Sequence, residues 1–113
     1  MVKNVNELLS RSADIDAKTS EGSNALIMSA LSNVPDAIQF FLDKGFYINE
    51  TNNKGQTALI TAATKIMKAS VEYLIKAGAD LNIMSTKGKT ALTYAREGGF
   101  EDIANILEQA GAQ

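Results

Sequence analysis

The chain has 113 residues, with 13 acidic and 11 basic side chains, no cysteine and no histidine. This length suits one domain, and a hydrophobic content of 45% argues against a disordered chain. The missing residue types exclude disulfides, zinc sites built from Cys and His, and Ser-His or Cys-His catalysis, while a net charge of −2 disfavours nonspecific nucleic-acid binding.

The predicted elements recur along the chain with a period of 33 residues. Self-similarity at such a spacing is typical of a solenoid built from stacked units. Several positions keep the same register, and they are the opening glycines Gly22, Gly55 and Gly88, the closing glycines Gly45, Gly78 and Gly111, and the pairs Ala25-Leu26, Ala58-Leu59 and Ala91-Leu92.

The first predicted element is a short helix over residues 4–11. Val5, Leu8 and Leu9 fall on one face of it, in the register of the second helix of each later unit. We therefore expect a half repeat whose first helix is missing. Either this half repeat is a natural cap of the array, or the chain was cut from a longer array.

The first full unit is expected to open at Gly22 and to begin its inner helix after Asn24. Asn24 stands where Thr57 and Thr90 stand later, and all three types cap helix N-termini through a side-chain oxygen. Small residues follow, which lets inner helices of neighbouring units approach closely. After a turn at residues 33–35, the outer helix carries the apolar stripe Ile38, Phe41 and Leu42.

The second unit differs from the others between its two helices, where it has Ile66-Met67. A β-branched residue is strained in the left-handed conformation, so we expect this turn to be built differently or one helix to be longer. An exposed docking corner is the alternative. In the third unit Gly98-Gly99 forms the turn, and Glu108 replaces an apolar position. That carboxylate leads us to expect no further repeat and a natural C-terminus.

The repeated frame resembles that of ankyrin-repeat proteins, over nearly the whole chain. The similarity is carried by Gly55-Gln56-Thr57-Ala58-Leu59, the pair Ala62-Ala63 and the ending Gly78-Ala79-Asp80-Leu81-Asn82. Two places depart from the family pattern. Ile66-Met67 replaces the usual Gly-His, and Phe46-Tyr47 replaces the Ala-Asp pair, either as packing between repeats or as a local contact patch.

The resemblance implies an all-α solenoid of three full repeats and an N-terminal capping half repeat, with hairpin-like loops that protrude. The expected divisions of this single domain are residues 1–16 for the half repeat, 17–49, 50–82 and 83–113 for the repeats. It also implies a non-catalytic module that binds a partner protein. The opening residues lack a signal peptide, and no stretch of about 18 apolar residues occurs, so we expect a cytoplasmic monomer without membrane contact or cofactor.

The conspicuous carboxylates and glycines are explained by structural roles in turns and at helix ends. Few residues are therefore left as candidates for catalysis or metal binding. Asp14, Asp16 and Asp80 lie in closing turns, where side-chain acceptors satisfy backbone amides, and Asp102 lies in the first turn of an outer helix. The glycines mark single turns and never form a phosphate-binding loop. We expect no catalytic or metal-binding site.

The resemblance places partner binding on the loop tips and on the concave face of the inner helices. The candidate residues at these positions are Thr51, Asn53, Lys54, Gln56, Thr64, Lys65, Met84, Thr86, Lys87, Lys89 and Glu97. Lys18, Ser20, Glu21, Ser23, Leu31, Ser32 and Gly98 occupy the remaining free positions.

Four lysines on this surface suggest a basic stripe. Lys54, Lys65, Lys87 and Lys89 lie toward the second and third repeats, where they would attract a partner with an acidic surface. The alternative is that they only solvate the loops. Two other functions stay open, namely a nucleic-acid or acidic-ligand binder that uses these lysines, and a structural fragment of a longer array. No aromatic residues interleave with the lysines, which disfavours single-stranded nucleic acid.

Overall fold

Six α-helices follow one another in residues 18–112, the part of the chain that the computed structural model describes, and these residues contain no strand. The helix expected over residues 4–11 and the half repeat up to residue 16 lie outside the described residues, as do Asp14 and Asp16. The helices are α3 (Ala25–Ala30), α4 (Pro35–Asp43), α5 (Ala58–Thr64), α6 (Lys68–Lys76), α7 (Ala91–Gly98) and α8 (Glu101–Gln109).

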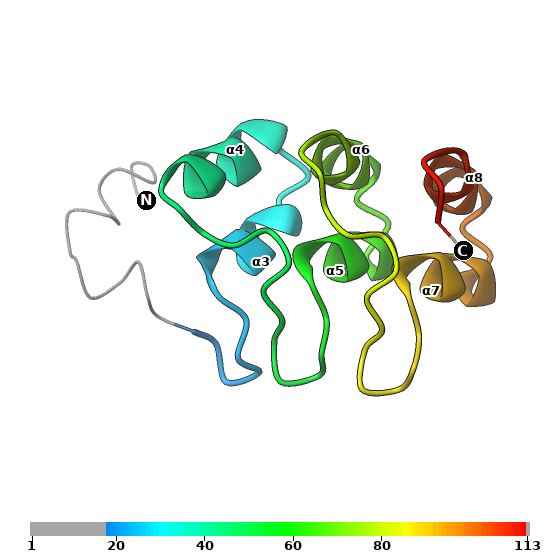
Figure 1. Ribbon diagram of the computed structural model, residues 1–113, viewed down its shortest axis with the longest axis horizontal. Helices are drawn as coiled ribbons and strands as arrows, with labels where there is room; N and C mark the ends of the chain where they lie inside the picture. Colours follow the sequence, from blue (N-terminus) through cyan, green and yellow to red (C-terminus); the bar gives the residue numbers. More distant parts are fainter. Residues whose placement is uncertain (1–17, 113) are drawn as a thin grey trace.

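The helices form two layers, and each repeat contributes one helix to each layer. Figure 1 shows α3, α5 and α7 in one row, with α4, α6 and α8 in a second row above them. Helices pack within each pair and also against the same helix of the next repeat. This arrangement confirms the all-α solenoid with an ankyrin-like repeat.

Each inner helix begins at the residue expected from the sequence. Asn24 Oδ1 accepts a hydrogen bond from the Ile27 amide at 2.9 Å, and the hydroxyls of Thr57 and Thr90 accept the equivalent bonds at 3.2 Å. These oxygens satisfy amides that the first helical turn leaves without partners. The outer helices lack such caps of their own, and α4 instead begins with Pro35 in its first turn.

The core lies between the layers and between neighbouring repeats. Small residues fill the inner helices where they meet, and Ala30, Ala62 and Ala95 are completely buried. Larger aliphatic side chains seal the space under the outer helices. The largest fully buried side chains are Leu26, Ile27, Ile38, Leu59, Ile60, Leu74, Leu92, Ile103 and Leu107.

The turn at Ile66 corrects the expectation from the sequence. Asn33, Ile66 and Gly99 occupy the same repeat position and are all left-handed, with φ of 58°, 61° and 75°. The Met67 amide donates to the Ala62 carbonyl at 2.9 Å, as Phe100 does to Ala95 at 2.8 Å. The second turn is therefore built like the third, and the isoleucine accepts the strain. Its side chain is 56% exposed, so burial of the side chain is not what compensates the strain.

Neighbouring repeats are also joined by capping across the array. Asn33 Oδ1 accepts from the amides of Ala69 and Ser70 at 3.0 and 3.3 Å, so a residue of one repeat caps α6 of the next. Asn49 similarly accepts from the Asp80 amide at 2.9 Å. Asp80 in turn accepts from the Asn82 amide, as expected for a closing turn. The bonds of Asn33 and Asn49 fix the register of two stacked units.

The two aromatic residues at positions 46 and 47 have different environments, one packed against the core and one exposed. The Phe46 ring meets Phe41 edge to face, with centroids 5.3 Å apart, and is partly buried against the core. Tyr47 is 63% exposed. Phe46 therefore contributes packing, whereas Tyr47 belongs to the surface.

Two opening glycines offer a test of how closely adjacent loops approach. Gly55 and Gly88 have φ of 72° and 74°, so alanine is strained equally at both positions. A Cβ at Gly55 would lie 2.9 Å from the Thr86 backbone nitrogen, but a Cβ at Gly88 would meet nothing within 4 Å. Gly55→Ala should therefore destabilise the fold by about 1 kcal/mol more than Gly88→Ala. Urea unfolding of both variants measures this difference, and equal losses would contradict the close loop contact.

Candidate functional site

A groove runs along the inner helices and the loops that precede them. Its volume is about 590 Å³, and its walls come from all three repeats. In Figure 1 the three loops extend from the inner helices, on the side opposite the outer helices. The residues that line the groove are Thr19, Ser20, Glu21, Ser23, Met28, Leu31, Asn52, Lys54, Gln56, Thr61, Thr64, Lys65 and Tyr94.

The loops that form one wall are hairpin-like and bonded to each other. Within single loops, the Asn52 amide donates to the Gln56 carbonyl at 3.0 Å, and Ser85 donates to Lys89 at 2.8 Å. Between loops, the Asn53 amide donates to the Glu21 carbonyl, and Thr86 to Lys54, both at 2.9 Å. This ladder holds the wall in one shape without a regular strand.

A buried asparagine supports the middle loop from inside. Asn52 Oδ1 accepts from the amides of Lys54 and Gln56 at 2.9 and 3.0 Å, and its Nδ2 donates to Ser23 Oγ at 3.3 Å. Asn52 is only 8% exposed. The groove wall is thus preorganised, because the side chain that orders it has few alternatives to these bonds.

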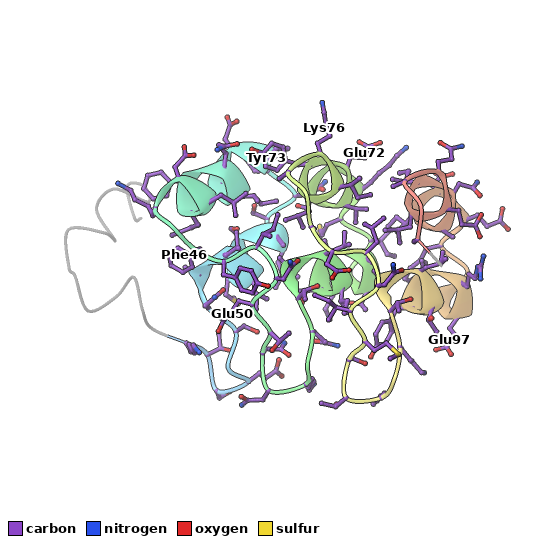
Figure 2. The ribbon with its side chains drawn as sticks, in the orientation of Figure 1. Phe46, Glu50, Glu72, Tyr73, Lys76 and Glu97 are labelled. Atoms are coloured by element: carbon purple, nitrogen blue, oxygen red, sulfur yellow. The ribbon has the colours of Figure 1, made fainter. Side chains whose placement is uncertain are left out.

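The structure places four of the candidate residues in the groove. Lys54, Gln56, Thr64 and Lys65 line it. The other candidates do not line it, and they are Thr51, Asn53, Met84, Thr86, Lys87, Lys89 and Glu97. Figure 2 shows Glu97 on the loop side of α7, whereas Lys76 projects from α6 on the opposite side of the molecule.

Five lining residues were missed by the sequence reasoning, and they are Thr19, Met28, Asn52, Thr61 and Tyr94. Three of them share one repeat position, because Met28, Thr61 and Tyr94 are spaced by 33 residues. The 33-residue spacing therefore could have identified these three residues as one surface position. The candidate positions were taken from the ends of the inner helices, whereas the groove floor lies at the middle of each helix.

Ion pairs reduce the basic character expected for the four lysines. Lys54 Nζ lies 3.9 Å from a Glu21 carboxylate oxygen, and Lys89 Nζ lies 2.7 Å from Glu97. Within residues 18–112 no ion pair involves Lys65 or Lys87. The surface is therefore mixed in charge, with Lys65 as the unpaired cation inside the groove.

Tyr94 lines the groove from the third repeat and belongs to a cluster of bonded side chains. The Tyr94 and Ser85 hydroxyls lie 2.8 Å apart, and Lys89 Nζ lies 5.7 Å from the centre of the Tyr94 ring. The pKa of Lys89 is raised above its ordinary value, chiefly because its ammonium donates a hydrogen bond to Glu97. The charge of Lys89 is therefore already engaged by Glu97.

No cluster of three or more acidic side chains that could hold a metal ion occurs in residues 18–112. Asp102 lies in the first turn of α8 beside Glu101, where negative charge favours the helix dipole. None of the helices in this part of the chain is long and apolar enough to cross a membrane.

Comparison with known proteins agrees with the architecture. No curated protein matches the sequence. The family model for ankyrin repeats, which describes three copies, matches residues 1–85 and again residues 46–113. Ankyrin repeats are generally modules of protein–protein interaction. The two matches together extend over the whole sequence, and the chain therefore belongs to the ankyrin-repeat family.

Proposed function

We propose that this protein binds another protein through the groove and the adjoining loop tips, as an adaptor or as an inhibitor that covers a partner's working surface, without catalysis of its own. The observation that carries the proposal is a groove formed by all three repeats and supported from within by buried hydrogen bonds. A rigid surface loses little conformational entropy on binding, so a contact area of ordinary size suffices.

The loop tips extend the proposed surface beyond the groove. Met84 is 61% exposed, and Thr86 and Lys87 are exposed beside it. Their backbone is held by the bond between Thr86 and Lys54 and by the bond from the Gly88 amide to the Ser85 carbonyl at 2.8 Å. An exposed apolar side chain on an ordered loop suits contact with a protein better than contact with a polyanion.

The nucleic-acid alternative receives less support from these contacts. Binding of a phosphate backbone depends on several free cations in a row. Two of the four lysines already contact carboxylates, and Glu21 and Glu97 lie beside them. A duplex would therefore approach a surface of mixed charge, and the proposal of a protein partner is the stronger one.

Affinity capture from extract of the source cells tests the proposed function. The intact protein is compared with a variant in which Lys54, Lys65 and Lys87 are all changed to glutamate. We expect at least one protein to be retained by the intact form and lost from the variant, because the changes reverse charge in and beside the groove.

A matched control changes the same number of charges on the other side. Lys44, Lys68 and Lys76 are exposed residues of the outer layer, and their change to glutamate should leave capture unaltered. Circular dichroism must first show that all three proteins are equally folded. Loss of the same partner from both variants would argue against the groove, and retention of nucleic acid alone would favour the alternative.

A further inference from the structure

Three side chains form a row across the floor of the groove. Met28, Thr61 and Tyr94 occupy the same position in successive repeats, and all three line the groove. Because α3 packs against α5 and α5 against α7, a segment that crosses the inner helices meets them in this order. It meets a thioether first, a threonine side chain with a buried hydroxyl next, and then an aromatic ring.

The middle of this row contains a polar group without a partner. Thr61 is 8% exposed, and its Oγ1 makes no hydrogen bond within residues 18–112. The neighbouring Thr64 hydroxyl, in contrast, donates to the Thr61 carbonyl at 2.9 Å. Thr61 Oγ1 itself has almost no accessible surface, so Thr61 forms part of the groove floor but its hydroxyl is not open to a ligand.

A groove lysine that has no ion pair in residues 18–112 lies one helical turn beyond Thr61. Lys65 follows Thr61 by four residues, which places the two side chains on the same face of the α5 region. Lys65 is exposed and lines the groove. An exposed ammonium beside the groove floor suits a carboxylate, which accepts charge-assisted hydrogen bonds from it.

The first repeat supplies an apolar surface beside this pair. Met28 is 44% exposed and Leu31 is partly exposed, and both line the groove. Neighbouring packed helices lie roughly 10 Å apart, and an extended chain advances roughly 3.3 Å for each residue. A side chain over α3 and a second over α5 are therefore about three residues apart in an extended ligand.

We propose that the groove binds an extended segment of a partner protein in which an acidic residue lies about three positions from an aliphatic residue. The aliphatic side chain contacts Met28 and Leu31, and the carboxylate bonds to the Lys65 ammonium. This inference rests on the proposed protein-binding function and names the chemistry of the segment. The exposed pair of Lys54 and Glu21, at 3.9 Å, is weak enough to open toward a second acidic residue.

The test uses a displayed library of random 12-residue peptides selected on the purified protein. Selected peptides should be enriched in an aspartate or glutamate about three positions from Leu, Ile, Val or Met. Their affinity is then measured by fluorescence polarisation. Lys65→Met keeps the aliphatic stem and removes the charge, so it should weaken binding about tenfold.

Two further variants serve as controls. Thr61→Val removes a buried hydroxyl beneath the groove surface and nearly keeps the shape of the side chain, so it should leave affinity unchanged and stability unchanged or raised. Lys68→Met removes an exposed charge at the start of α6 and should leave affinity unchanged. Raising NaCl from 0.05 to 0.5 M should weaken binding to the intact protein more than to Lys65→Met.

Several outcomes would overturn this inference and leave the proposed function standing. They are the selection of basic peptides, the absence of any enriched peptide, or equal affinity of Lys65→Met and the intact protein. If the capture experiment still retains a partner that the triple glutamate variant loses, the groove binds a surface of different chemistry. If capture also fails, the proposed function itself is wrong.

Discussion

Leu59→Ala is expected to lower the free energy of unfolding by about 2 to 5 kcal/mol. Leu59 is 1% exposed in α5, the inner helix that packs against α3, α6 and α7. Truncation removes buried methyl groups and leaves a cavity in a close-packed core, which the surrounding residues close only in part. Leu74, fully buried in α6, should behave similarly.

Denaturant unfolding of these variants and of two surface variants measures the effect. Lys65→Ala and Lys87→Ala change exposed residues without an ion pair inside the described part of the chain, so they should alter stability by no more than about 0.5 kcal/mol. Equal losses at leucine and lysine positions would mean that the repeat register assigned to the core is wrong.

Ile66→Asn is expected to stabilise the protein by about 1 to 2 kcal/mol. Ile66 has φ of 61°, and a branched side chain in this conformation costs about 1 to 2 kcal/mol, which asparagine largely avoids. Asparagine also adds a cap. Asn33, one repeat earlier, caps α6, and the equivalent amides of the next repeat are those of Asp102 and Ile103 in α8.

The gain is partly offset by lost contacts of the isoleucine. Ile66 and Phe100 line a hollow of about 270 Å³ at the start of α8, and removal of a half-exposed aliphatic side chain costs about 1 kcal/mol there. Ile66→Gly is the matched control, because it relieves the strain but cannot cap, so it should gain less than Ile66→Asn. A Tm of Ile66→Asn at or below that of the intact protein would show that neither effect operates at this turn.

At the Ile66 turn, the local backbone preference and the tertiary packing favour different conformations. Local preference argued for a different turn at Ile66-Met67, because branched residues disfavour the left-handed region. The stacking of α5 and α6 on both neighbours requires the same turn as in the third repeat, where Gly99 is at this position. Packing shared by six helices outweighs the strain of one residue.

The 33-residue spacing by itself predicts part of the mixed charge of the loops. Glu21, Lys54 and Lys87 are spaced by 33 residues, so the first two are neighbours in adjacent loops. The Lys89–Glu97 pair joins a loop to the same repeat's inner helix, and it depends on how far the loop folds over α7. Such contacts depend on side-chain reach, which spacing alone does not define.

The sequence by itself determined the repeat period, the three inner-helix caps and the opening and closing glycines. These features depend on residues within one turn, so local chemistry is sufficient to predict them. Only the tertiary structure decided the turn at Ile66, the capping of α6 by Asn33 and the row of Met28, Thr61 and Tyr94 in one groove. The last two features join residues of different repeats, because stacked helices bring equivalent positions side by side, and the turn at Ile66 follows from the packing of its two helices on the neighbouring repeats.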